Sequence, residues 1–537
     1  MGLTDCLVDT DSVYVAEVPA GLSGNPQRNT VFGIDAGGGL TTGENNTFIG
    51  NDAGLGNTTS SSMVAIGWES ALSTNSNANS VSIGARANRG GGSSNGVIIG
   101  ASAAYNGAAS NAVVIGQAAG NSSAGNETVL IGQFAGAFGT AASKQIAIGA
   151  GQAGRSNTAD EHMDVGYAAG YSNTSGISNT NIGFEAGYSN TTSGQRTCIG
   201  WRAGKSNTGV SNTFIGRSAG SVSSTGASNV VVGSNCMAFG AIGTQNVAIG
   251  VQAAQSATGN YNAIVGMQAG QYMTSGNNNT FLGFEAGRNV TIGGSNVVIG
   301  YQAMDANTDG DDNVAIGANA LGAATSDGRT VAIGVNALKL QNQTFSPMNT
   351  AVGYAADDAN VSGFGRTCIG GSSGGGATGD NITNIGYQAV TSTSSVSNEI
   401  TLGNSSVTSL RCAVTSITSL SDERDKSEIK DLEYGLNLID ALQPREFVWD
   451  NRVETDKEGK EFFSSNKGKK DFGFIAQEVQ ALDNDTLRLV YDENPEKLEL
   501  SYGKLVPVLV KAIQDLSAKV TALELSLIHI SEPTRPY

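Results

Sequence analysis

The chain has 537 residues, including 74 glycines and eight prolines, and its formal net charge is −17. This acidity argues against a nucleic-acid-binding protein, and because no run of 18 apolar residues occurs, we expect no insertion into a membrane. The cysteines are scattered without a C-x-x-C spacing, so we expect no disulfide framework, no zinc site and no cofactor; they are Cys6, Cys198, Cys236, Cys368 and Cys412.

Residues 1–28 precede the first repeat and form a short N-terminal segment. Met1–Cys6 lacks the basic and apolar regions of a secretory signal peptide, so we expect no export by the Sec route. The segment is short for a docking domain, which indicates attachment through another protein.

A glycine recurs 23 times from Gly33 to Gly403, in steps of 16 or 17 residues with a single step of 19. The residue before each glycine is apolar, and alanine stands three residues after 18 of the 23 glycines. Asn, Ser, Thr and Gly fill the intervals, as turns require, and short runs such as Val113–Ile115 are typical of strands. So long a register disfavours a flexible linker and predicts a mostly β, parallel β-roll or β-helix-like shaft over residues 29–403.

Each coil of the predicted shaft is narrow. A 17-residue coil has an extended perimeter of about 56 Å, so folding it into two or three sides leaves an interior that suits a column of alanines. Stacked at roughly 4.8 Å per coil, the repeats give a shaft about 105 Å long. Because so thin a coil buries little apolar surface within one chain, we expect chains to share burial in a homotrimer.

One turn between repeats matches the first half of a calcium-binding loop. Asp305, Asn307 and Asp309 stand at the spacing D-x-N-x-D-G, which makes them weak candidates for metal ligands. The twelfth position of the loop is Ile316, where calcium binding calls for a glutamate. A plain acidic turn without a metal is therefore the favoured interpretation.

Aromatic residues recur directly after the repeat glycine and would form a column along the shaft. Such a column could hold sugar rings, although rings that cover the shaft surface or pack between chains are the favoured alternative. Glu185 and Glu285 follow two of these aromatics and are candidates for the carboxylate pair of a glycosidase. The aromatic positions are Trp68, Tyr167, Phe184, Trp201, Phe284, Tyr301, Tyr354 and Tyr387.

Charge density changes at Ser421, after a junction at residues 404–420. About 9% of residues 1–420 are charged, against about 34% of residues 421–537. From Ser421 the pattern is that of a small α+β domain, with a helix before Pro444, a strand at 447–449 and a strand running into a helix at 472–479. Apolar residues then alternate steps of three and four, which predicts a coiled-coil helix; they are Val506, Leu509, Ile513, Leu516, Val520, Leu523 and Leu527.

Motifs in residues 421–524 resemble the endosialidase-type intramolecular chaperone domain that ends many phage tail fibres and tail spikes. They are Ser421–Lys426 with Ile429 and Leu432 beyond, Leu442–Pro444, Gly473–Glu478, and Tyr502–Leu505 running into Ala512–Gln514. The repeats more loosely resemble the Asn-Thr-x-Ile-Gly arrays of phage fibres and of the heads of trimeric autotransporter adhesins. The first resemblance implies a domain that trimerises, aligns the shafts and then cuts itself off.

The resemblance implies one self-cleavage at the Leu420–Ser421 bond, with Ser421 as nucleophile and Lys426 as base. A serine hydroxyl needs a base, and neither of the two histidines lies in residues 421–524, so a His-based triad is excluded there. Lys426 can serve if burial or a trimer interface favours its neutral form, whereas the neighbouring Asp425 would favour the charged form and slow cleavage. The alternative interpretation of Ser421 is a plain helix N-cap.

These features predict a structural phage tail-fibre protein for host attachment, made in the host cytoplasm and carried in the virion. Its expected partners are further copies of itself, other tail proteins and a glycan or protein receptor on the host surface; no enzyme acting on an external substrate is expected. A polysaccharide-degrading tail spike and a bacterial trimeric adhesin head without enzymatic activity are the alternatives. Residues 525–537 contain two prolines and lose the coiled-coil pattern, so we interpret them as a non-native tail.

Overall fold

The computed structural model describes residues 6–9, 12–15, 27–73, 77–107, 110–122, 125–138, 143–222, 224–343, 347–407, 409–411, 421–450, 454–455, 461–462, 467–483, 487–492 and 498–530. The chain divides into two compact units, Met1–Gly365 and Arg366–Tyr537. No helix of the described residues combines the length and the apolar character that crossing a membrane requires.

The first unit begins with a hairpin and continues with one three-residue strand per coil. The hairpin strands are β1 (Cys6–Asp9) and β2 (Ser12–Val15). The coil strands are β3 (Thr30–Phe32), β4 (Thr47–Ile49), β5 (Val64–Ile66), β6 (Val81–Ile83), β7 (Val97–Ile99), β8 (Val113–Ile115), β9 (Val129–Ile131), β10 (Ile146–Ile148), β11 (Met163–Val165), β12 (Thr180–Ile182), β13 (Thr197–Ile199), β14 (Thr213–Ile215), β15 (Val230–Val232), β16 (Val247–Ile249), β17 (Ala263–Val265), β18 (Thr280–Leu282), β19 (Val297–Ile299), β20 (Val314–Ile316), β21 (Val331–Ile333) and β22 (Thr350–Val352).

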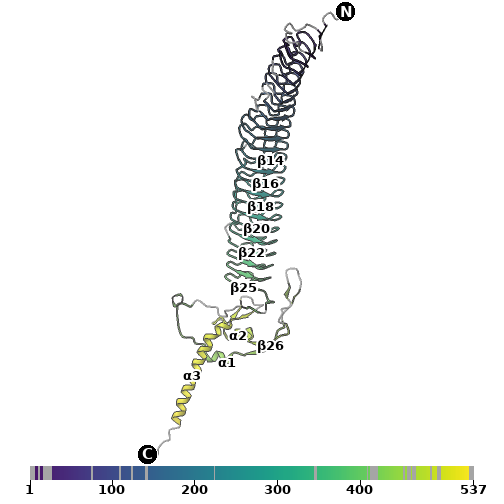
Figure 1. The fold of residues 1–537 in the computed structure, drawn as a ribbon. Coiled ribbons are helices and arrows are strands. Elements are labelled where there is room, and N and C mark those ends of the chain that lie inside the picture. The colour runs from purple at the N-terminus through teal and green to yellow at the C-terminus, as the bar shows by residue number, and fades with distance from the viewer. Residues whose placement is uncertain are drawn as a thin grey trace, which may run out of the picture. The chain divides into compact units, whose positions relative to one another are not determined.

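Consecutive coils stack strand upon strand. Strands β2 to β22 each pair in parallel with the next, residue opposite equivalent residue, while β1 pairs antiparallel with β2. The labelled strands of Figure 1 show this stacking. The predicted mostly β, parallel β-solenoid is therefore confirmed.

The repeat glycine is required by its backbone and by the coil above it. Gly50 has φ +131°, a value that side chains rarely adopt, and a Cβ placed on it would stand 2.7 Å from the carbonyl oxygen of Gly67. Gly67 is the equivalent residue one coil later, and a Cβ there would stand 2.7 Å from the Gly84 carbonyl oxygen. Each coil can sit directly on the next only because this column carries no side chain.

The interior is lined by the central residue of each strand and by the alanine that follows the glycine. Phe48, Phe214 and Phe281 at strand centres are fully buried, as is the alanine column, for example at Ala53. The aliphatic residue before the glycine instead faces outward, with Ile49 37% exposed. Strand alternation forces this outcome, because neighbouring side chains point to opposite faces. The cysteines buried in this interior are Cys198, Cys236 and Cys368.

A second buried column consists of asparagines that lie before the strands. The backbone N–H of Asn246 donates to Oδ1 of Asn229 in the preceding coil at 2.9 Å, and the Asn246 amide donates to the Gly259 carbonyl at 2.9 Å. Asn262 repeats the first contact on Asn246 at 2.9 Å. The sequence pattern had assigned these asparagines to turns, but the structure makes them rungs that satisfy buried backbone groups.

The second unit contains three further coils and a small α+β region. Its strands and helices are β23 (Thr367–Ile369), β24 (Thr383–Ile385), β25 (Ile400–Leu402), the 3-10 helix η1 (Glu423–Asp425), α1 (Leu436–Ala441), β26 (Arg445–Val448), β27 (Glu454–Thr455), β28 (Glu461–Phe462), β29 (Lys470–Gly473), α2 (Ala476–Asp483), β30 (Val490–Tyr491), β31 (Glu499–Leu500), η2 (Tyr502–Lys504) and α3 (Leu505–Ile530). Strands β23 to β25 pair in parallel, whereas β26–β29, β27–β28 and β30–β31 are antiparallel.

Helix α3 has two apolar faces with different environments. Leu505 and Val508 pack with Leu438 of α1 and Val479 of α2 in the core of the α+β region. The predicted coiled-coil positions lie elsewhere on the helix and are exposed, with Ile513 67% accessible. The helix itself is confirmed, and it continues to Ile530, while residues 531–537 lie outside the described residues.

Candidate functional site

Ser421 and Lys426 meet at the start of the α+β region. The Lys426 Nζ donates hydrogen bonds to the Ser421 Oγ at 2.6 Å and to the Ser421 carbonyl oxygen at 3.1 Å. Both side chains are exposed. The structure thus brings together the two residues proposed from the sequence, at hydrogen-bond distance between a nucleophile and a nitrogen base.

The turn that closes this contact is held by Asp422. Its Oδ1 accepts the backbone N–H of Arg424 at 2.9 Å, so Asp422 is the N-cap of η1. The Arg424 guanidinium pairs with the same carboxylate at 2.7 Å and holds the pKa of Asp422 below its usual range. Asp422, rather than Ser421, is therefore the N-cap of this turn, and the Ser421 hydroxyl instead contacts Lys426.

The bond expected to break lies one residue before this turn. Leu420, like the rest of residues 412–420, lies outside the described residues. The arrangement can move a proton between Oγ and Nζ whenever the lysine amine is neutral.

The turn at Asp305, Asn307 and Asp309 does not converge as a calcium loop would. Asn307 is fully buried, where its Oδ1 accepts the Gly310 N–H at 2.9 Å and its amide donates to the Asp327 carbonyl at 3.2 Å. Asp309 is exposed to solvent instead. In the part of the chain that is described, no group of His, Cys, Asp and Glu side chains is arranged to hold a metal.

Five of the eight aromatic residues in the column stack ring on ring, in the groups Tyr167–Phe184–Trp201 and Phe284–Tyr301. Tyr167 and Phe184 lie 5.1 Å apart between centroids at 11°, and Phe184 and Trp201 lie 6.3 Å apart at 13°. The next coil places the Arg217 guanidinium 5.4 Å from the Trp201 ring centroid. Sugar rings bind aromatic faces, and these faces are already covered by neighbouring coils, so the geometry favours the structural alternative.

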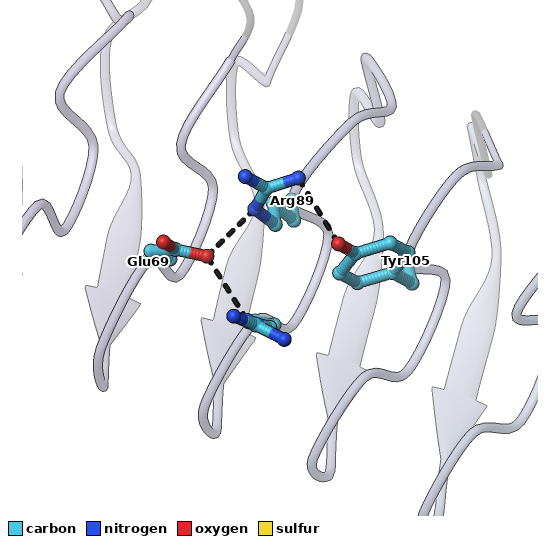
Figure 2. A network of polar contacts seen from close by, with 4 residues as sticks. Glu69, Arg89 and Tyr105 are labelled. Carbon is cyan, nitrogen blue, oxygen red and sulfur yellow. Dashed lines mark hydrogen bonds and ion pairs between the residues drawn. The ribbon is translucent and has the colours of Figure 1, made fainter.

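Acidic residues two places after the repeat glycine tie adjacent coils together. Figure 2 shows Glu69 beside Arg89, which in turn reaches Tyr105 one coil further on. Glu69 Oε2 accepts from Arg89 at 2.7 Å and from Arg86 at 3.0 Å, and Arg89 donates to the Tyr105 hydroxyl at 3.0 Å. These contacts make a surface ladder rather than a pocket.

Glu185 repeats this arrangement and does not pair with Glu285. It accepts from Arg202 at 2.8 Å and Lys205 at 2.7 Å. The two glutamates follow β12 and β18, six coils apart, which corresponds to about 29 Å at roughly 4.8 Å per coil. A glycosidase needs carboxyl groups within about 10 Å of one another, so these two residues cannot form such a pair within one chain.

Sequence analysis missed a set of buried polar residues inside the first unit. His162, Asp164 and Arg196 are each at most 3% exposed. The signal was available, because Asp164 occupies a strand centre where most coils carry an apolar residue or alanine. It was overlooked because the sequence pattern does not fix which face of each strand points into the solenoid.

Comparison with known proteins finds a match for part of the second unit. Residues 421–488 match the family described as chaperone of endosialidase, and the match begins at Ser421 itself. No curated protein and no solved structure matches the chain. A β-solenoid at residues 30–402 is thus followed by a match to the chaperone-of-endosialidase family, an organisation that fits a tail fibre with a C-terminal chaperone domain.

Proposed function

We propose that this chain is a structural tail-fibre protein for host attachment, whose C-terminal domain assembles three copies in register and then releases itself at the Leu420–Ser421 bond. The observation that carries the release step is the 2.6 Å contact between Lys426 Nζ and Ser421 Oγ. This contact lies at the first residue of the chaperone domain. The position is the one at which cleavage would separate the repeats from the domain.

The proposed cleavage is an acyl shift followed by hydrolysis. Neutral Lys426 takes the Oγ proton as Ser421 Oγ attacks the Leu420 carbonyl carbon, and the lysine returns that proton to the departing Ser421 nitrogen. The peptide C–N bond breaks and an ester links the Leu420 acyl group to the Ser421 oxygen. Water then hydrolyses the ester, leaving a carboxyl group on Leu420 and a free amine and hydroxyl on Ser421.

This chemistry requires assembly. In a single chain Ser421 and Lys426 are both exposed, and only a neutral amine can accept the Oγ proton. Burial of the turn against other copies of the domain would remove water and favour the neutral amine. We therefore propose that cleavage follows assembly, so that the domain leaves only after the repeats have been aligned.

The solenoid supports association of copies through its outer strand face. In every strand from β3 to β22 the first residue is Thr, Val, Ile, Met or Ala and the third is aliphatic or Phe, and neither is ever fully buried. Two such columns make an uncharged stripe about 90 Å long and roughly 7 Å wide. Its area, on the order of 600 Å², is at the upper end of the largest patch that a monomer usually exposes.

The occupant proposed for this stripe is another copy of the chain. A partner must present apolar side chains at the same coil spacing over the same length, and the chain itself meets that condition. The exposed seam of α3 supports the same conclusion, because Leu509, Ile513 and Leu516 alternate steps of four and three, as a coiled coil requires. The resemblance to trimeric adhesin heads supports three copies.

The test is a purified full-length chain examined by denaturing gel and intact mass. We expect a fragment ending at Leu420 and a second beginning at Ser421, together with a native mass of three chains. Ser421→Ala should leave only the intact chain, while Ser427→Ala, a neighbouring exposed serine, should cleave normally. Intact chain in an assembled wild-type sample would contradict cleavage but not the chaperone role.

A further inference from the structure

The interior of the first unit changes character between Gln145 and Asn207. One apolar cluster ends with Ala147 and Ala153, and the next begins at Ala186. Between them the strand centres are Asp164 in β11 and Asn181 in β12. Two stretches of apolar interior are therefore separated by coils with a polar interior.

Buried polar atoms without a hydrogen-bond partner concentrate in the same coils. In the described residues, eight of 13 such side-chain atoms fall between residues 145 and 207. Buried polar groups in folded proteins are nearly always satisfied, and where protein groups do not suffice, ordered water does so. The eight atoms are Gln145 Nε2, Arg155 Nε, Asn157 Nδ2, His162 Nδ1, Asp164 Oδ2, Arg196 Nε and Nη1, and Asn207 Nδ2.

Asp164 is the centre of this polar interior. Its carboxyl is fully buried, and Oδ1 accepts the Asn181 amide at 2.8 Å. Its Oδ2 and the Gln145 Nε2 stand 2.9 and 2.5 Å from the point that a Cβ on Gly154 would occupy, so both converge on the same spot. Desolvation raises the pKa of Asp164 to about 7.

Among the described residues, no cation forms an ion pair with Asp164. The groups that face it from the adjacent coils are Gln145 and Asn181, both neutral. His162 in its own coil makes a 3.2 Å contact with Asn173, and burial lowers the pKa of His162 to about 4, so its ring is neutral at physiological pH. Two coils on, Arg196 Nη2 donates to the Gly204 carbonyl at 3.2 Å and to the Cys198 sulfur at 3.7 Å, and Arg196 forms no ion pair with Asp164.

We propose that the coils from β10 to β13 hold ordered water around a neutral Asp164 carboxyl, and that loss of its proton opens these coils. A neutral carboxyl donates its Oδ2 proton to a water that also accepts from Gln145 Nε2, which satisfies both atoms. An ionised Asp164 would be a buried carboxylate without a cation, which is costly. The protonated carboxyl therefore keeps these coils closed, and its ionisation opens them.

The exterior of the same coils carries the aromatic stacks. Tyr167, Phe184 and Trp201 form one stack, and Tyr171 and Tyr188 form a second with centroids 4.8 Å apart at 6°. Each stacked pair contributes roughly 0.5–1.5 kcal/mol in other proteins. The stacked rings on the exterior therefore stabilise the same coils whose interior is polar.

The test is hydrogen exchange of the purified full-length chain at pH 6.5 and pH 8.5, corrected for the intrinsic rate. The linkage has a fixed sign: a carboxyl whose pKa is raised from 3.8 to about 7 stabilises the fold at low pH, and that stabilisation is lost as pH rises through 7. We expect the opening constant of β11 to rise roughly fourfold across this interval, because most of the loss of stability falls between pH 3.8 and 7. Strands β16 to β18, with an apolar interior, are the internal reference and should not change.

Asp164→Asn keeps the shape of the side chain and cannot ionise, so it should abolish the pH-dependent opening of β11. Asp164→Val, which introduces the residue found at the equivalent position in β15 and β19, should abolish it as well. Phe184→Ala should speed exchange of β11 to β13 while the pH dependence persists. Wild-type exchange in β11 that does not change with pH, or a pH dependence that survives in Asp164→Asn, would overturn the proposal.

Discussion

The solenoid coils and the α+β region differ in how often each contact occurs. In the coils the same contacts recur. The Gly67 N–H donates to the Ile49 carbonyl oxygen at 2.8 Å, and one coil later the Gly84 N–H donates to the Ile66 carbonyl oxygen at 2.8 Å. In the α+β region contacts are made once, as when Arg445 pairs with Glu478 at 3.0 Å. A slip by one coil would preserve most solenoid hydrogen bonds, whereas any shift within the domain breaks unique ones. The proposed alignment of chains requires such unique contacts, and the α+β region rather than the coils supplies them.

The largest expected effect separates the chemistry of the domain from its folding role. Lys426→Arg keeps a cation and hydrogen-bond donors beside Ser421, but a guanidinium does not lose its proton in proteins. We expect complete loss of the Leu420 fragment on a denaturing gel, with the native mass of the assembly unchanged.

Lys430→Arg, in the same exposed segment, is the matched control and should cleave as the wild type does. Normal cleavage in Lys426→Arg would show that the lysine acts only as a charge or a turn element, and the base assignment would have to be abandoned.

The second prediction concerns the helix that follows the unique contacts. Replacing Ile513 and Val520 on the exposed seam of α3 with lysine puts charges at the expected interface while leaving the buried residue Val508 intact. We expect native mass to shift from trimer to monomer, with helix content retained, and cleavage to fall with it because assembly precedes cleavage.

Gln514→Lys with Thr521→Lys has the same seven-residue spacing off the seam and should remain trimeric. If the seam variant still forms trimers, the solenoid stripe rather than α3 holds the chains together. That result would place the contact that sets the register in the solenoid coils rather than in the α+β region.

The third prediction probes the coils themselves. A Cβ on Gly67 would stand 2.7 Å from the Gly84 carbonyl in a backbone conformation that side chains rarely adopt, so Gly67→Ala should destabilise its coil by roughly 2–4 kcal/mol. Hydrogen exchange of β5 and β6 in a denaturant series measures this loss.

Gly376 has φ +82° and no atom within 4 Å of its built Cβ, so Gly376→Ala carries only the backbone strain and should cost less. Equal losses at the two sites would mean that contact between coils adds nothing at Gly67.

The residues of the candidate site could be predicted from the sequence, but their geometry could not. Residue types and the motif resemblance pointed to Ser421 and Lys426, but only the 3-10 turn capped by Asp422 shows how five residues of chain bring the two side chains together. The cap role had been weighed for Ser421 itself, because Ser and Asp are both good caps and their positions differ by one residue.

The sequence by itself determined the coil, because a glycine with positive φ under a neighbouring backbone admits no other residue, and that requirement repeats at every turn of the solenoid. It also determined the helix positions of the C-terminal region through their apolar spacing. Only the tertiary structure decided which strand side faces inward, since Phe48 and Ile49 are both apolar and alternate between faces. That decision buried Asp164 and left Ile49 outside, and it underlies both the proposed proton-dependent opening of the coils and the uncharged stripe.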